Sequence, residues 1–156
     1  MKIKFLHIIL GVMLLTGCAF YNNRSTQPEM KNENISKENN QMNITVGEHV
    51  FKVMLANNSS ADALKEYLVK GPVTLALSDY SGFEKVGNLG TTLPQNNEKM
   101  NTVAGDIILY QGNQFVIYYG ENSWNLTRLG KIEGVSKEEL QEVLGNGDVE
   151  VIISLP

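Results

Sequence analysis

Cysteine and histidine are nearly absent from this sequence, and their scarcity excludes several kinds of site. Cys18 is the only cysteine in 156 residues, so the rest of the chain has no disulfide, redox pair or thiolate metal site. Beyond residue 17 the only imidazole is His49, which excludes a multi-histidine metal centre and leaves any catalytic triad dependent on one residue. We therefore expect no metal and no cofactor, and a domain held together by its hydrophobic core.

Basic residues are also few and scattered. The chain carries 13 lysines and arginines against 17 acidic residues. Lys2 and Lys4 fall in a segment that we expect to be removed, so 11 basic residues remain against 17 acidic ones, a net charge of about −6. A negative field of this size repels phosphate backbones, and no basic run interleaved with aromatics offsets it. Nucleic acid is therefore not an expected partner.

The apolar run at the amino terminus is too short to span a membrane. It extends from Phe5 to Leu15, about eleven residues, whereas a hydrocarbon core of roughly 30 Å requires about twenty residues of helix. Lys2 and Lys4 precede this run, and the sequence LTGC that ends at Cys18 resembles the lipobox cut by lipoprotein signal peptidase. We predict that residues 1–17 are a lipoprotein signal peptide and that Cys18 is lipidated. The alternative is a plain secretory peptide that happens to contain a cysteine.

The residues after Cys18 predict a tether. Two or three acyl chains on this cysteine would anchor the protein stably, since a single chain binds only marginally. Residues 19–41 are rich in Asn, Lys, Glu, Ser and Gln and poor in aromatics, so they cannot bury enough surface to offset their ordering entropy. We expect residues 18–41 to be a flexible tether, and the protein to be extracytoplasmic, held by membrane lipid on the cell membrane or the outer membrane.

Residues 42–156 predict one mainly β domain. Short runs rich in β-branched and aromatic residues predict strands at 42–46, 49–55, 73–79, 83–89, 106–110, 114–119, 124–132 and 148–155. One helix is predicted to follow a cap at Ser59 or Ser60, to carry an apolar stripe from Ala61 to Leu68 and to end at Gly71 and Pro72. A second, capped helix is predicted from Ser136 to Leu144. The polar residues 90–102 predict a loop. Because the central strands are apolar on both faces, we expect a closed eight-stranded β-barrel capped by two short helices.

Four segments of this domain resemble, in order, the signature segments of the bacterial cyclophilin-like proteins. They are LALSDYSGFEK at 75–85, VAGDIILY at 103–110, FVIYYG at 115–120 and TRLGKI at 127–132. The resemblance covers nearly all of residues 42–156. It implies an eight-stranded cyclophilin-type barrel capped by two helices, the same architecture that the strand count predicts.

The resemblance leaves the activity open. Cyclophilins proper are prolyl isomerases in which an arginine hydrogen-bonds the substrate near the imide, but their FHR-like strand and QGGD-like segment do not occur in this sequence. Residues 42–156 contain one arginine, Arg128, and one tryptophan, Trp124. Similar folds do not imply similar activities. We therefore expect a non-catalytic module that binds a proline-containing peptide, another ligand or an envelope protein. The alternative is a prolyl isomerase acting on exported proteins, with Arg128 or a lysine as its electrophile.

The first candidate ligand-binding residues lie on one predicted strand. Trp124, Leu126 and Arg128 share a face because side chains alternate with a period of two. An aromatic ring, an apolar side chain and a guanidinium on one face can recognise an extended peptide or a planar ligand. The alternative is that Trp124 lies at the barrel rim while Arg128 pairs with a surface acid such as Glu133.

The second candidate set consists of tyrosines on the central strands, Tyr110, Tyr118 and Tyr119. They would line a cleft in which Asp79 or Glu121 supplies a polar contact, or they would pack against a helix or a neighbouring strand. Asp79 and Asp106 lie at strand ends beside glycines, where aspartate commonly serves turn geometry rather than acid–base chemistry. We assign no catalytic residue.

Overall fold

The computed structural model describes residues 40–156, so the predicted signal peptide, Cys18 and nearly all of the predicted tether lie outside the described residues. The strands in this range are β1 (Gln41–Val46), β2 (His49–Leu55), β3 (Val73–Tyr80), β4 (Glu84–Asn88), β5 (Glu98–Thr102), β6 (Asp106–Tyr110), β7 (Gln114–Tyr118), β8 (Asn122–Ile132) and β9 (Val149–Ser154). The helices are α2 (Ser59–Leu68) and α3 (Lys137–Leu144). Neither helix of this described range is long and apolar enough to cross a bilayer.

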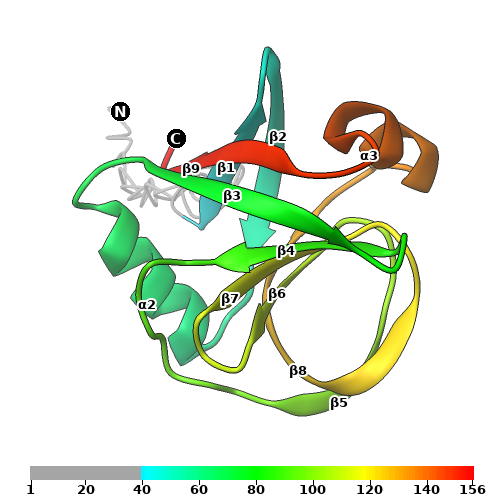
Figure 1. Cartoon of the computed structure of the whole chain (residues 1–156). Helices are drawn as coiled ribbons and strands as arrows, with labels where there is room; N and C mark the ends of the chain where they lie inside the picture. The colour runs from blue at the N-terminus through cyan, green and yellow to red at the C-terminus, as the bar shows by residue number, and fades with distance from the viewer. Residues whose placement is uncertain (1–39) are drawn as a thin grey trace, which may run out of the picture.

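Eight of the strands form a closed antiparallel barrel. Neighbours pair in the order β2, β1, β9, β3, β4, β7, β6, β8, and β8 then pairs with β2. This closing pairing sets Leu55 opposite Gly130 and Val53 opposite Ile132. A Cβ added to Gly130 would lie 2.6 Å from the carbonyl oxygen of Met54, so the closing seam requires glycine. Figure 1 shows the ring of strands with α2 and α3 on opposite sides of it.

The barrel confirms the predicted fold class, but a ninth strand corrects the prediction for residues 90–102. The second half of that predicted loop is β5, which pairs with Asn122–Leu126 of β8 and sets Met100 opposite Trp124. The sequence of β5, EKMNT, has no apolar alternation that would predict a strand. β5 forms because β8 is eleven residues long and β6 pairs only with its Thr127–Lys131 portion, which leaves the first half of β8 in need of backbone partners.

The cap of α2 also differs from the prediction. Asn58, not Ser59 or Ser60, is the N-cap, and its side chain accepts a hydrogen bond from the Ala61 N–H. Its amide nitrogen donates to the Arg128 carbonyl, 2.8 Å away, which ties the helix to β8. Ser60 is instead fully buried and donates to the carbonyl of a loop proline. The prediction for α3 is confirmed more closely, because Ser136 caps that helix as expected.

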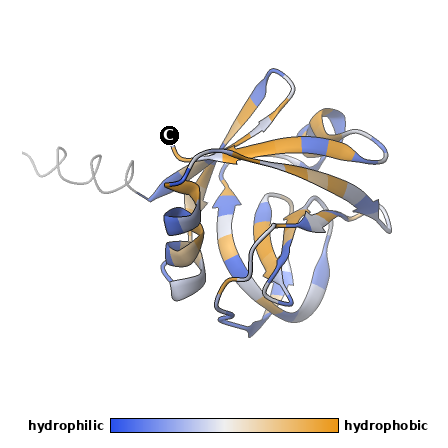
Figure 2. Ribbon diagram, turned by 60° about the vertical axis from the view of Figure 1, so that its left-hand side comes forward, coloured by the Kyte–Doolittle hydropathy of each residue, from blue (hydrophilic) through white to orange (hydrophobic). Residues whose placement is uncertain are grey.

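The strands β6 and β7 are apolar on both faces, and the two faces belong to different clusters. Alternate residues along them lie in the barrel core, which α2 and α3 also enter: Ile107, Leu109, Phe115 and Ile117. The residues between them face outward, because successive side chains of a strand point to opposite faces. These outward residues and one from β8 form a second buried cluster, Ile108, Val116, Tyr118 and Leu126, called here the outer cluster. Figure 2 shows how apolar residues concentrate on the strands.

Candidate functional site

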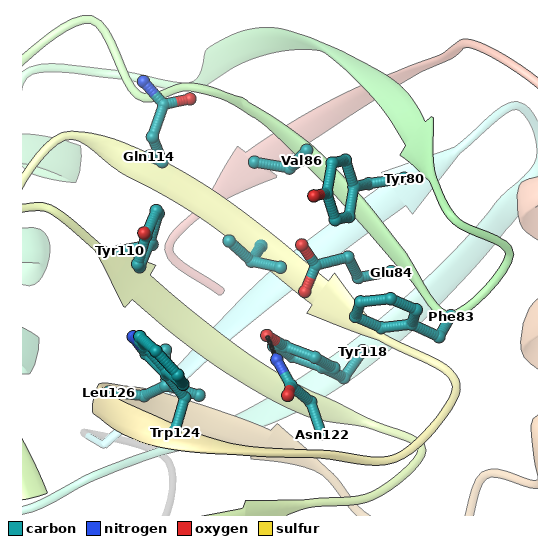
Figure 3. Close-up of a pocket in the computed structure, with 11 residues that line it drawn as sticks. Tyr80, Phe83, Glu84, Val86, Tyr110, Gln114, Tyr118, Asn122, Trp124 and Leu126 are labelled. Atoms are coloured by element: carbon teal, nitrogen blue, oxygen red, sulfur yellow. Dashed lines mark hydrogen bonds between the residues drawn. The ribbon is translucent and has the colours of Figure 1, made fainter.

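A groove of about 400 Å³ lies over the outer cluster, on the outside of the barrel. We call it the aromatic groove, and its lining residues come from β3, β4, β6, β7, β8 and the turn between β3 and β4. They are Tyr80, Phe83, Glu84, Val86, Tyr110, Gln114, Val116, Tyr118, Asn122, Trp124 and Leu126 (Figure 3). A groove of this size matches the lower range of small-ligand sites.

Strand register explains why these residues meet. Glu84 of β4 lies opposite Tyr118 of β7, and Val86 lies opposite Val116. Directly opposed residues of an antiparallel pair point to the same face, so the two strands present a matched row of side chains outside the barrel. Asn122, Trp124 and Leu126 continue that row on β8 by the same alternation.

Aromatic rings form the walls of the groove. Phe83 and Tyr118 are stacked, with ring centroids 6.1 Å apart, and Tyr80 meets Phe83 edge to face at 5.8 Å. Trp124 is 60% exposed and Tyr80 is 56% exposed, although each carries a large apolar ring. Exposed aromatics that rim a concave apolar surface are typical of a binding site.

Glu84 is the one charged side chain among the described residues that line the groove. Its Oε2 atom is shielded from solvent and has no hydrogen-bond partner within residues 40–156. Burial raises the pKa of Glu84, and a hydrogen bond from Tyr118 opposes that shift. The Asn122 side chain donates to the Tyr118 hydroxyl at 3.1 Å, so the amide, phenol and carboxyl groups form a chain along the floor of the groove.

Replacing Glu84 with glutamine is expected to raise the free energy of unfolding near neutral pH. The folded-state pKa of Glu84 lies above its ordinary value of 4.5, so the ionised carboxylate weakens the folded state once the pH exceeds that raised pKa. Well below pH 4.5 the Glu84 carboxyl is protonated in both the folded and the unfolded state. The free energies of unfolding of the wild type and Glu84→Gln should then differ little. Urea unfolding across a pH series measures the difference. A Glu84→Gln protein less stable than the wild type at neutral pH would contradict this account.

Arg128 lies on the same outer face but does not line the groove. Its guanidinium lies 3.2 Å from Asp106, a carboxylate whose side chain is only 1% exposed, and Lys131 contacts the same oxygen at 3.1 Å. The acid beside Arg128 is therefore Asp106 rather than Glu133. Asp106 also accepts the Val103 N–H, so it serves the turn before β6 as well as the two cations.

Tyr119 and Asp79 lie in the end of the barrel nearest α3, apart from the aromatic groove. Tyr119 directly follows Tyr118 and so faces the opposite side, where its hydroxyl donates to the Asp79 carboxylate. Lys85, which is 0% exposed, donates to Asp79 at 3.0 Å and to the carbonyls of Gly145 and Gly147 at 2.8 and 2.6 Å. These three acceptors use all three N–H donors of the ammonium group.

The residues predicted from sequence to bind ligand are thus divided among several places. The aromatic groove is lined by four of them, Tyr110, Tyr118, Trp124 and Leu126. Arg128 lies beside the groove, and Tyr119 and Asp79 belong to the Lys85 cluster. Glu121 lines a separate hollow with Tyr119 and Lys137. The aromatic groove also contains residues that the prediction missed: Tyr80, Phe83, Glu84 and Asn122.

The positions of the His, Cys, Asp and Glu side chains in the described residues show whether they could form a metal site. Between residues 40 and 156, no three His, Cys, Asp or Glu side chains come close enough together to hold a metal ion. His49 lies exposed at the start of β2, as the sequence predicts for a solvent-facing strand residue.

Comparisons with known proteins agree on the fold. A family model described as the Cyclophilin-like family matches residues 44–154. A solved structure, the solution structure of a hypothetical protein from Archaeoglobus fulgidus, superposes with a TM-score of 0.56 at 12% sequence identity. The superposition covers 74% of this chain and 94% of the archaeal one, and at this identity it shows a shared fold alone. The search of curated proteins gives no match.

Proposed function

Because this chain belongs to the cyclophilin-like family, we propose that it is a membrane-anchored binding module whose aromatic groove holds an extended peptide of an envelope or exported protein. The observation that carries this proposal is a concave surface outside the barrel, walled by aromatics and open to solvent. Trp124 and Tyr80 remain largely exposed at its rim, where a bound peptide would cover them. Aromatic side chains offer large contact areas at low entropic cost, which suits peptide recognition.

The anchor is the acylated cysteine at position 18. This part of the proposal is supported by the sequence around the cysteine, where a short apolar run and two lysines precede LTGC. Acyl chains on Cys18 would hold the barrel at the outer side of a membrane, and residues 19–41 would give it reach. The module would then meet its peptides in the envelope.

Replacing Cys18 with serine is expected to move the protein from the membrane pellet to the soluble fraction. Serine has no thiol to acylate, so the chain would lose the only group proposed to insert into lipid. Cell fractionation followed by immunoblotting measures the distribution, and labelled palmitate supplied to the cells should enter the wild type only. Ser36→Ala, a change within the tether, is the control and should stay in the pellet. Retention of the Cys18→Ser chain in the pellet would contradict the anchor.

Family membership also favours a second candidate, a peptidyl-prolyl isomerase acting on exported proteins. The contacts of Arg128 argue for binding without isomerisation, because the guanidinium is engaged by Asp106 and lies outside the groove lining. A protease-coupled assay with the Cys18→Ser chain, freed of residues 1–17, separates the two functions. Uncatalysed isomerisation takes tens to hundreds of seconds, so acceleration is easily seen. We expect none at micromolar protein. Acceleration that disappears in Arg128→Ala would establish the isomerase instead.

A further inference from the structure

The aromatic groove combines a single acidic group with aromatic walls, and this combination is selective for charge. Its described lining residues include five aromatic rings and one carboxylate, that of Glu84, but no lysine, arginine or histidine. We propose that the groove binds the ammonium group of a lysine side chain carried by an extended peptide. This inference rests on the proposed peptide-binding function and names the side chain that the groove selects.

The rings supply the first part of the recognition. Figure 3 shows Tyr80, Phe83 and Tyr118 close to Glu84, with Trp124 on the far side of the groove. The face of an aromatic ring carries partial negative charge and attracts a cation within about 6 Å of its centroid. An ammonium group beside the Glu84 carboxylate would lie among these rings.

The Glu84 carboxylate supplies the second part. Its Oε2 atom lacks a hydrogen-bond partner among the described residues, and a buried acceptor without a donor is unfavourable. The neighbouring Lys85 does not neutralise it, because that side chain points into the barrel and is used by Asp79 and two carbonyls. A primary ammonium group bound at the Glu84 carboxylate would supply the donor that Oε2 lacks. A neutral apolar side chain would leave Oε2 without a donor.

The shape and field of the protein suit the rest of a lysine side chain. The four methylene groups of lysine can lie along apolar surface while the charged end reaches a polar partner. Val86, Val116 and Leu126 provide that apolar floor. The net charge of about −6 expected for the mature chain also draws cations toward the surface.

The emission of Trp124 reports binding directly, because it is the only tryptophan in the chain and it lines the groove. The soluble Cys18→Ser chain without residues 1–17 is titrated with two end-capped pentapeptides of alanine. One carries a central lysine and the other carries norleucine, which has a similar stem but no ammonium group. We expect the lysine peptide to bind about tenfold more tightly than the norleucine peptide at neutral pH.

Variants assign that preference to the carboxylate. In Glu84→Gln the preference for the lysine peptide should fall to the two- to threefold share that the rings contribute, about 0.5 kcal/mol, whereas Glu48→Gln, in the exposed turn between β1 and β2, should retain the tenfold preference. Binding of the norleucine peptide to Glu84→Gln shows that the variant is folded. The same result shows that the groove is still intact in Glu84→Gln, so a weaker preference for lysine is not caused by a disrupted groove.

Acid should weaken the binding of the lysine peptide. The other ionisable groups facing Glu84 across the groove are the phenols of Tyr80, Tyr110 and Tyr118, and burial raises the pKa of Tyr118. Glu84 is therefore the only carboxyl group among the described residues that line the groove. The preference for lysine should be full above the raised pKa of Glu84 and lost as the pH falls through it, while norleucine binding stays constant.

The outcomes separate the inference from the function on which it rests. Equal binding of the lysine and norleucine peptides to the wild type would overturn the inference and leave a peptide-binding groove. The absence of any saturable change in Trp124 emission with either peptide would overturn both. A lysine preference that is undiminished in Glu84→Gln would overturn the assignment of the carboxylate.

Discussion

Replacing Lys85 with methionine is expected to lower the free energy of unfolding by about 3 kcal/mol. The ammonium group is completely buried, and it joins Asp79 to the carbonyls of Gly145 and Gly147 in the connection between α3 and β9. Methionine fills the space but donates no hydrogen bond, so two carbonyls lose a donor and Asp79 loses its cation. Most of the cost comes from the two carbonyls left without a donor, because the Asp79 side chain is 29% exposed and can be solvated.

Urea unfolding of Lys85→Met and of Lys52→Met tests this expectation. Lys52 is exposed on β2, and its replacement should change stability by less than about 0.5 kcal/mol. Equal effects at Lys85 and Lys52 would show that the buried cluster contributes little to the fold.

The loss of stability in Lys85→Met should also depend on pH. The hydrogen bond from Tyr119, followed by that from Lys85, holds the pKa of Asp79 below its ordinary value of 3.8. A depressed folded-state pKa adds stability that is present above 3.8 and disappears as the pH falls through the lower value. The difference between the wild type and Lys85→Met should therefore narrow in strong acid.

Replacing Trp124 with alanine is expected to weaken peptide binding by about thirtyfold, which corresponds to about 2 kcal/mol. The indole is the largest side chain at the rim of the aromatic groove, and truncation would remove a wall from the proposed ammonium site. Stability should change little, because the residue is 60% exposed in the absence of a ligand. Anisotropy of a labelled lysine peptide measures the affinity without relying on tryptophan emission.

Val50→Ala is the matched control for that substitution. Val50 is 57% exposed on β2 and does not line the groove. Its variant should bind the peptide as the wild type does. Undiminished affinity in Trp124→Ala would place the peptide elsewhere on the barrel.

Most of the barrel could be predicted from the sequence because its signals are local. The glycine turn between β1 and β2 and the dense apolar runs of β6 and β7 define hairpins without any knowledge of tertiary contacts. β5 could not be predicted in this way. The polar sequence of β5 becomes a strand only because β8 extends past β6 and its free first half pairs with β5. This is a tertiary effect that no local pattern indicates.

The site was harder to predict because it depends on register. Tyr118 and Tyr119 are adjacent in one strand, and alternation alone could have separated them into an outward and an inward residue. Glu84 meets Tyr118 through the pairing of β4 with β7, strands that are distant in sequence, so no local pattern brings the two together. The burial of Lys85 could not be predicted, because a fully buried lysine is rare and a charged residue in a strand usually faces solvent.

Amide chemical-shift mapping with the lysine pentapeptide tests most directly whether peptides bind outside the barrel, in the aromatic groove. We expect the largest shift changes to fall on β4, β7 and Asn122–Leu126 of β8, and to follow one saturating curve. Shift changes confined to the β1–β2 hairpin or to α3 would contradict it.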